Sequence, residues 1–188
     1  MAATPRILWS TVNSAPGPPS SVCTHASRAG VNKERLYNYF GDKRQLFSSV
    51  LAEQLGQIAD AVPLVITSLN DVGEFATRTF DYQLQHPELG RLVIWEGLTD
   101  TGALPDEAER SALYRRKVQT IRTAQEARLV TDAVSAPHLL FLPLSISSWW
   151  ASAPQLARMI ASEDEAGDSR TARRAAVKDT ARRIAGPR

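Results

Sequence analysis

The sequence predicts an all-α protein, and three observations carry this prediction. After residue 42, apolar residues recur at spacings of three and four, which is the period of an amphipathic helix. Proline, glycine and capping residues stand between these apolar segments and mark the ends of helices. No segment alternates apolar and polar residues as a half-buried strand does. The length of 188 residues suits one medium domain, or a small domain followed by a larger one.

The first predicted helix is short and runs from Lys33 to Tyr39, about two turns. Gly30 before it suits a tight turn, because glycine tolerates positive φ, and Asn32 is a good N-cap. Leu36 and Tyr39 or Phe40 are three and four residues apart, so they share one inward face. The free face then carries two cations, a phenol and an amide: Lys33, Arg35, Tyr37 and Asn38. Such a face suits a nucleic-acid groove.

A long helix is predicted next, beginning at Asp42 and ending at about Pro63. Asp42, with Gln45 three residues later, resembles a capping box. Apolar residues follow at helical spacing: Leu46, Phe47, Val50, Leu51, Leu55, Ile58 and Val62. This helix would connect the segment around residue 35 to the body of the protein.

Six further helices are predicted in the body. Asn70 or Asp71 can cap the first, which ends near His86. Pro87 can occupy the first turn of the next helix, which runs to about Leu98. Four more helices are predicted, with Asp168 or Ser169 capping the last, at about 105–129, 137–152, 154–162 and 169–184.

The predicted helix at 138–153 is apolar on nearly every side. Its apolar residues are Leu139, Leu140, Phe141, Leu142, Leu144, Ile146, Trp149 and Trp150. A helix of this kind must be buried all round. In a body this small, one side is expected to meet another subunit; the alternative is an ordinary central core helix.

The run AGVNKERLYNYFGDKRQLF, residues 29–47, closely resembles part of the DNA-binding domain of the tetracycline-repressor (TetR) family of bacterial regulators. In that family an Ala-Gly-Val-Ser/Asn turn precedes a Leu-Tyr-x-(His/Tyr)-Phe recognition helix, and a Lys at the start of the next helix touches DNA phosphate. The matching positions are Gly30, Val31, Asn32, Leu36, Tyr37, Tyr39, Phe40 and Lys43. Residues 86–96 and 149–159 resemble the family's ligand-binding domain more weakly. Together the resemblances cover most of residues 29–188.

The N-terminal segment departs from the family's pattern. A member should open with two amphipathic helices, and only the outer ends, at residues 6–8 and 27–30, resemble them. Between these ends stand Pro16, Pro18 and Pro19, and each proline costs about 3 kcal/mol inside a helix. Three segments are therefore predicted: an irregular one at 1–28, the recognition helix with the following helix start at 29–48, and a ligand-binding and dimerisation domain at 49–188.

Basic residues gather near the N-terminus. The chain has a net charge of +2, but residues 1–48 carry six Lys/Arg against two Asp/Glu, and the remainder carries sixteen against eighteen. A head of charge +4 on a body of charge −2 fits a polyanion-binding end. Without the recognition motif, solvated surface would be the simpler interpretation of these charges.

Several classes of protein are not supported by the sequence. No run of eighteen apolar residues and no secretory signal layout is present, so a cytoplasmic location is expected. The single cysteine and three histidines lack metal-ligand spacing, and neither a metal nor another cofactor is expected. No nucleophile elbow, phosphate loop or paired-carboxylate motif occurs, so the chain is not expected to be an enzyme.

Seven residues are candidates for DNA contact: Asn32, Lys33, Arg35, Tyr37, Asn38, Tyr39 and Lys43. Lys33 and Arg35 are long enough to reach guanine edges in the major groove. Tyr37 and Lys43 would hold phosphates, Lys43 beside a helix N-terminus. For Tyr39, packing in the core is an equal alternative.

Seven residues are candidates for a ligand pocket: Phe75, Tyr82, His86, Trp95, Leu98, Tyr114 and Trp149. Aromatic residues at helical spacing are more often part of a core than of a pocket. His86, beside a proline at a helix break, is the one polar candidate in this group.

The resemblance implies a ligand-responsive, TetR-like transcriptional regulator, expected to be a repressor. Its homodimer would form through a bundle of the helix at 137–152 and the last helix. Its partners would be a palindromic double-stranded DNA operator and a small-molecule effector. The alternative is a dimerising, ligand-binding or inert body that no longer binds DNA, because a recognition helix of two turns needs the missing first two helices for support.

Overall fold

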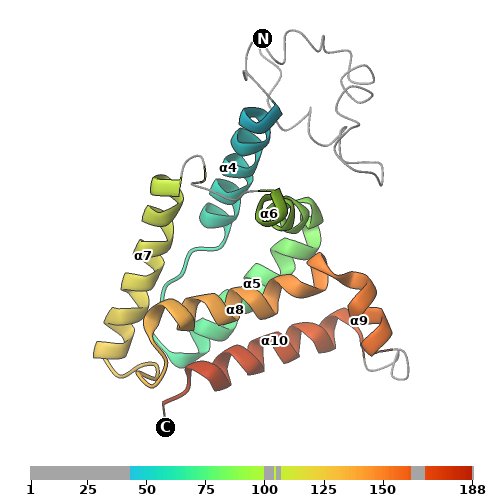
Figure 1. The fold of residues 1–188 in the computed structure, drawn as a ribbon. Coiled ribbons are helices and arrows are strands. Elements are labelled where there is room, and N and C mark those ends of the chain that lie inside the picture. The colour runs from blue at the N-terminus through green and yellow to red at the C-terminus, as the bar shows by residue number, and fades with distance from the viewer. Residues whose placement is uncertain (1–42, 100–103, 105–106, 162–167, 188) are drawn as a thin grey trace. The chain divides into compact units, whose positions relative to one another are not determined.

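The computed structural model describes residues 43–99, 104, 107–161 and 168–187. The described residues form helices and no strands, so the all-α prediction is correct. The helices are α4 (Lys43–Ala61), α5 (Leu69–Gln85), α6 (Pro87–Thr99), α7 (Glu107–Glu126), α8 (Ala136–Ser152), α9 (Pro154–Ile160) and α10 (Arg170–Ala185) (Figure 1). The chain divides into two compact units, Met1–Gln54 and Leu55–Arg188.

The predicted cap of α5 was wrong by two or three residues. The N-cap is Ser68, and Asp71 lies in the first turn of the helix. Asp71 Oδ2 accepts hydrogen bonds at 2.8 Å from the backbone N–H of both Thr67 and Ser68. The hydrogen bonds from Thr67 come first among the causes that hold the pKa of Asp71 below its ordinary value. A carboxylate inside the first turn therefore caps the helix by reaching back.

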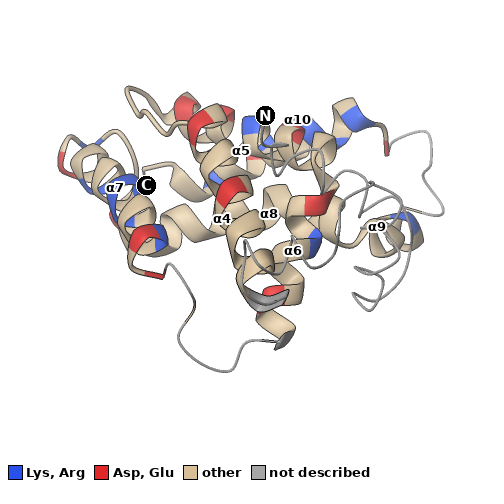
Figure 2. Ribbon diagram, turned by 90° about the horizontal axis from the view of Figure 1, so that it is seen from above, with Lys and Arg blue, Asp and Glu red and all other residues tan. Residues whose placement is uncertain are grey.

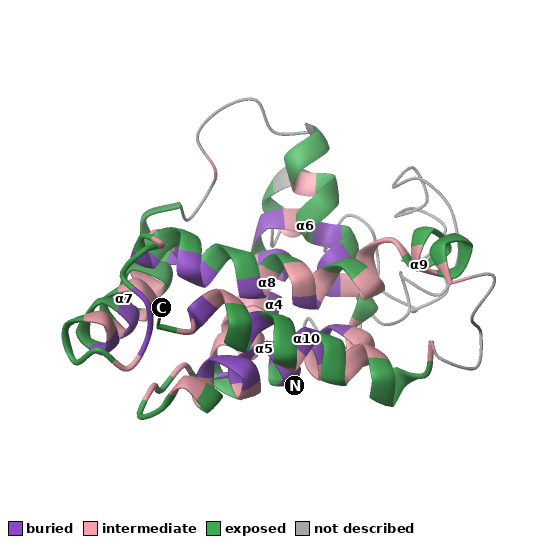
Figure 3. Cartoon of the chain, turned by 90° about the horizontal axis from the view of Figure 1, so that it is seen from below, coloured by how far each residue is buried: buried purple, intermediate pink, exposed green. Residues whose placement is uncertain are grey.

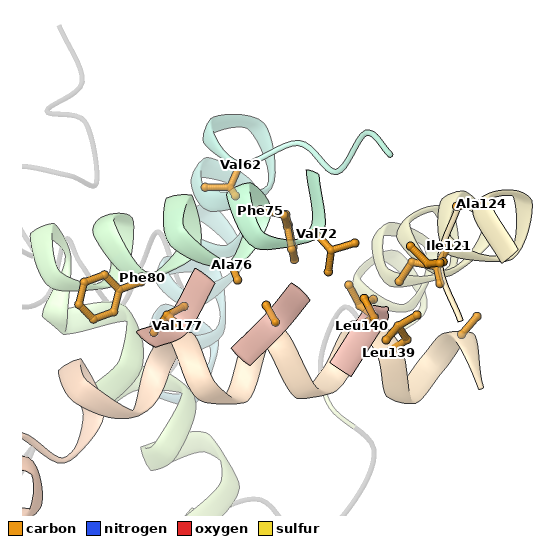
Figure 4. Close-up of a cluster of buried hydrophobic side chains, with 14 residues drawn as sticks. Val62, Val72, Phe75, Ala76, Phe80, Ile121, Ala124, Leu139, Leu140 and Val177 are labelled. Carbon is orange, nitrogen blue, oxygen red and sulfur yellow. The ribbon is translucent and has the colours of Figure 1, made fainter. Parts of the chain in front are cut away.

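The core of the second unit forms where α5 packs against α10 and α8, and α7 packs against α8. Figure 4 shows Ala76 and Phe80 of α5 close to Val177 of α10, with Leu139 and Leu140 of α8 nearer α7. All of these side chains are buried. Helices α5 and α10 come close because glycine and alanine stand at their contact. A Cβ atom on Gly73 would lie 2.8 Å from Arg182 Cγ.

A row of ion pairs borders the contact of α5 with α10. Asp81 accepts hydrogen bonds from Arg170 at 2.9 Å and from Arg174 at 2.8 Å. Lys178, two turns along α10 from Arg170, continues the row and donates to Glu74 of α5. Figure 2 shows the blue basic segments of α10 beside α5. These pairs fix the register of the two helices.

Helix α7 ends three residues earlier than predicted. The expectation was Leu129, but the helix stops at Glu126 and Arg128 takes a left-handed conformation with φ of 57°. Gln125 then holds the following turn, because its side-chain amide donates to the carbonyls of Thr131 and Val134. A lone arginine in the left-handed region is uncommon, so the sequence carries no signal for this stop.

Within the described protomer, helix α8 is not buried on every side, which argues against the alternative of an ordinary central core helix. Leu139, Leu140 and Ser147 face the core, but Phe141 is 67% and Trp149 is 57% exposed. Figure 3 shows α8 with buried and exposed segments side by side. The buried hydroxyl of Ser147 donates to the carbonyl of Ala76, which ties α8 to α5. An apolar outer face of α8 is therefore left uncovered within the described protomer.

Among the described residues, no helix combines the length and apolar character needed to cross a membrane. In the same residues, no group of histidine, cysteine, aspartate and glutamate is arranged to hold a metal ion.

Candidate functional site

The second unit contains a large cavity of about 1200 Å³. It is lined by the last turns of α4, by α5 to α9, and by Asp168. Most of the lining is apolar and includes Phe75, Leu89, Leu113, Leu140, Leu144 and Trp150. A cavity of this size and character is typical of a site for an organic small molecule.

One ion pair lies beside the cavity, and the sequence analysis did not single it out. Arg110 of α7 lines the cavity and its Nη1 donates to both carboxylate oxygens of Glu96 on α6, at 2.8 and 2.9 Å. The two side chains are only 10% and 14% exposed. Removing one partner of a pair this buried leaves the other charge without compensation. The pair therefore joins α6 to α7 through two residues that are 14 positions apart in the sequence.

A second cation lies on the cavity wall. Lys117 of α7 donates from Nζ to the carbonyl of Val62 at 3.0 Å and lies 5.0 Å from the ring centre of Phe75. Burial lowers the pKa of Lys117 below its ordinary value, and the neighbouring charge of Arg78 adds to this effect. The carbonyl and the aromatic face partly replace the water that this ammonium group has lost.

A polar corner is formed by α5, α6 and α8. Gln83, Gly90 and Ser152 all line the cavity there. A Cβ atom on Gly90 would lie 2.9 Å from Ser152 Oγ and 3.6 Å from Gln83 Oε1. The missing side chain of Gly90 therefore keeps the space beside these two oxygens open.

The predicted ligand residues divide into two groups. Phe75, Tyr114 and Trp149 line the cavity. Burial raises the pKa of Tyr114 above its ordinary value; Arg110 acts against this shift and Glu96 adds to it. The phenol is therefore protonated at neutral pH.

The other candidates, Tyr82, His86, Trp95 and Leu98, do not contribute to the lining. Tyr82 and His86 stack on each other with ring centres 4.3 Å apart. The backbone N–H of His86 closes α5, and its Nδ1 lies 3.3 Å from Glu88 Oε1. These contacts give His86 a role at the break between α5 and α6.

Arg110, Glu96, Gln83 and Lys117 were missed by the sequence analysis. Glu96 offered a signal, because it is the only charged residue in the otherwise apolar run Leu92–Leu98. Arg110 and Lys117 offered none, since they lie among the many charges of a helix that reads as solvated surface.

Most candidates for DNA contact lie outside the described residues: Asn32, Lys33, Arg35, Tyr37, Asn38 and Tyr39. Lys43 is the first residue of α4, and its side chain also lies outside the described part. These seven assignments stay predictions.

An all-α body surrounds a large apolar cavity and follows a basic segment in the sequence. This combination fits a regulator in which binding of a small molecule changes the binding of a polyanion. Comparisons with known proteins identify the family. Residues 71–183 match the model of the "Tetracyclin repressor-like, C-terminal domain". The chain belongs to the TetR family, and it is a transcriptional regulator of the TetR type rather than an enzyme.

Two relatives from Streptomyces coelicolor are similar over most of their length. The HTH-type transcriptional repressor SCO4008 is 40% identical over 160 residues, which are 85% of this chain and 81% of the relative. The crystal structure of the proposed transcriptional regulator SCO4942 superimposes with a TM-score of 0.74 at 28% identity. That match covers 87% of this chain and 86% of the other. Repressors of this family bind DNA operators and typically form dimers.

Proposed function

We propose that the chain is a ligand-responsive repressor that binds a palindromic operator as a homodimer. The observation that carries this proposal is the combination of the large cavity in the second unit with the basic recognition segment before it. A ligand that binds one arrangement of the dimer more tightly shifts the population toward that arrangement. The recognition helices then no longer match half-sites spaced by about 34 Å, one turn of DNA.

The similarity to SCO4008 supports a role for the recognition segment in DNA binding. A matched stretch of about 160 residues in a chain of 188 must begin no later than about residue 29, because 188 − 160 is 28. The stretch therefore includes the run from Gly30 to Lys43 that carries the DNA candidates. The relative that shares this stretch is named a repressor, which favours repression here.

Dimerisation is proposed through α8 and α10. The outer face of α8 exposes Phe141, Leu142 and Trp149, and the outer face of α10 exposes alanines 172, 175 and 176. Large apolar groups on one helix and small residues on the other allow two such pairs to pack as a four-helix bundle. A contiguous apolar surface of this kind is rarely left to water.

The test of DNA binding is a titration of the full chain on a pool of random operator sequences at two salt concentrations. Selection of a palindromic sequence and a steep loss of affinity with salt are expected. Lys33→Ala should weaken binding, whereas Arg91→Ala, at an exposed position of α6, should not. Weak, unselective binding by a stable dimer would instead support the alternative function, a TetR-like body that has lost its operator. The prolines at 16, 18 and 19 motivate that alternative.

A further inference from the structure

A guanidinium group on the cavity wall has two nitrogen atoms without a hydrogen-bond partner in the described part of the chain. Arg110 is only 9% exposed, and its Nη1 is occupied by Glu96. Its Nε and Nη2 donate to no acceptor among the residues that the structure describes. Buried donors are nearly always satisfied in native proteins, because leaving one unpaired costs free energy. Arg110 therefore requires an acceptor that the described protein does not supply.

The geometry of the free donors narrows the choice of acceptor. Nε and Nη2 lie on one edge of the guanidinium plane, and their N–H bonds on that edge point in nearly parallel directions. This fork matches the two oxygens of a carboxylate, which form a bidentate pair with arginine. Glu96 binds at Nη1 and leaves this edge open.

Glu96 already compensates the charge of Arg110, so the charge balance of the cavity wall depends on the other charged side chains that line it. Among the described residues, three charged side chains line the cavity: Arg110, Lys117 and Asp168. Asp168 is already paired with Arg173 of α10. With Arg110 paired to Glu96 and Asp168 paired to Arg173, the charge of Lys117 leaves the wall of the cavity able to accept one negative charge.

A second unsatisfied group faces the same cavity from the polar corner. Gln83 is 7% exposed, lines the cavity, and its Oε1 has no hydrogen-bond partner among the described residues. The oxygen is an acceptor, so it would be satisfied by a hydroxyl or amide N–H of a ligand. The open space beside Gly90 would admit such a group.

We propose that the effector is an organic carboxylic acid with a large apolar body. Its carboxylate binds the Nε–Nη2 edge of Arg110, its apolar body fills the cavity, and any hydroxyl or amide on that body donates to Gln83. This inference rests on the proposed function, since it names the chemical class of the effector. It is tested by direct binding, which requires no operator.

The experiment uses three probes that share a ten-carbon chain and differ in the head group: decanoate, decan-1-ol and decylamine. Each is titrated calorimetrically into the full chain at neutral pH, where decanoate is an anion and decylamine a cation. We expect decanoate to bind at least about tenfold more tightly than either of the others, because only its head group can form the charge-assisted bidentate pair.

Three variants assign the preference to the proposed group. Arg110→Lys keeps the charge beside Glu96 but removes the fork, and it should lose most of the preference for decanoate. The double variant Glu96→Gln/Arg110→Met removes both charges together and should bind decanoate and decan-1-ol about equally. Arg116→Met, at an exposed position of the same helix, should keep the wild-type preference.

The outcomes separate this inference from the proposed function. Tighter binding of decylamine, equal binding of the three probes, or no binding of decanoate would each overturn the carboxylate assignment and leave operator binding untouched. Unchanged preference in both Arg110 variants would overturn the role of Arg110. Failure of the proposed function would instead appear as unselective DNA binding, while the calorimetric preference for decanoate persisted.

Discussion

At the scale of single residues, a small number of polar side chains hold the structure at positions that apolar packing cannot define. Arg110 and Glu96 join α7 to α6, and Asp71 closes the N-terminus of α5. Each forms hydrogen bonds to groups that would otherwise be unsatisfied. Their contribution is therefore tested best by changing one partner at a time.

The variant Arg110→Met should lower the free energy of unfolding by about 3 kcal/mol, because it removes the cation that compensates the largely buried Glu96 carboxylate. The double variant Glu96→Gln/Arg110→Met should recover a large part of that loss. Urea denaturation of both variants measures the difference. The control Arg116→Met should stay within about 0.5 kcal/mol of the wild type. A double variant less stable than Arg110→Met would contradict this account.

Asp71→Ala should cost about 1 kcal/mol at neutral pH, because four hydrogen bonds to one carboxylate oxygen are lost. Asn70→Ala should have little effect, since Ser68 and Asp71 form the cap. The pKa of Asp71 is lowered on folding, so its contribution is complete above its ordinary pKa and is lost as pH falls through the lower, folded value. Thermal unfolding between neutral and acid pH should show the two curves converging in acid.

At the scale of helices, the contact of α5 with α10 combines small buried residues with a border of ion pairs. Ala76 and Ala181 are fully buried, so the backbones approach closely. At Asp81, burial opposes the charged form, but the hydrogen bonds and charges of Arg174 and Arg170 outweigh it and lower the pKa. Apolar contact thus supplies the packing, and the charges select the alignment.

Ala181→Leu should destabilise the protein by about 1–3 kcal/mol, because the larger side chain has no space between α5 and α10. Ala108→Leu makes the same change at an exposed position of α7 and should be nearly neutral. Chemical denaturation monitored by circular dichroism compares the two. Equal stability of the two variants would show that this contact is looser than the burial indicates.

The ion pairs between α5 and α10 should lose their stabilising effect in acid, as the Asp71 cap does. Asp81→Asn removes both arginine pairs, whose partners are partly exposed, so a loss of about 0.5–1 kcal/mol is expected at neutral pH. Because the pKa of Asp81 is lowered on folding, this stabilisation is complete above the ordinary pKa of the carboxyl group. It is lost as the pH falls through the lower pKa of the folded state. The difference in melting temperature between variant and wild type should therefore vanish in acid. A constant difference would exclude the ionised carboxylate as its source.

The positions of most helices could be predicted from the sequence, because proline and apolar spacing act locally. Pro87 and Pro154 begin helices in the structure, as expected, and α4 ends two residues before Pro63. The stop of α7 could not be predicted, since it depends on Arg128 in the left-handed region and on Gln125 bonding to a turn further along. The Arg110–Glu96 pair was equally hidden, because it requires two helices to be placed in space.

At the scale of the whole molecule, the cavity and the proposed subunit contact meet on one helix. Helix α8 supplies Leu140 and Leu144 to the cavity and exposes Leu142 on its outer side. The apolar composition of α8 was evident in the sequence, but which side stays uncovered follows only from the packing of α5 and α7 against it. The expected contact of one side with another subunit stays a prediction.

Leu142→Glu should convert a dimer into a monomer, because it places a charge at the centre of the proposed apolar contact without touching the cavity lining. Leu98→Glu makes the same change at a position of α6 that is also exposed, and it should leave the dimer intact. Size-exclusion chromatography with light scattering at micromolar concentration distinguishes the two. A wild-type chain that is itself a monomer would refute the contact.

Phe141 and Trp149 have a further consequence, since they both border the cavity and lie on the outer face of α8. If subunits associate through that face, a compound in the cavity and a neighbouring protomer touch the same two rings. Occupancy by the compound and self-association are then thermodynamically linked, and each must alter the equilibrium constant of the other. The apparent affinity of an inducer would therefore depend on how much protein is present, so a dose–response curve would shift with expression level.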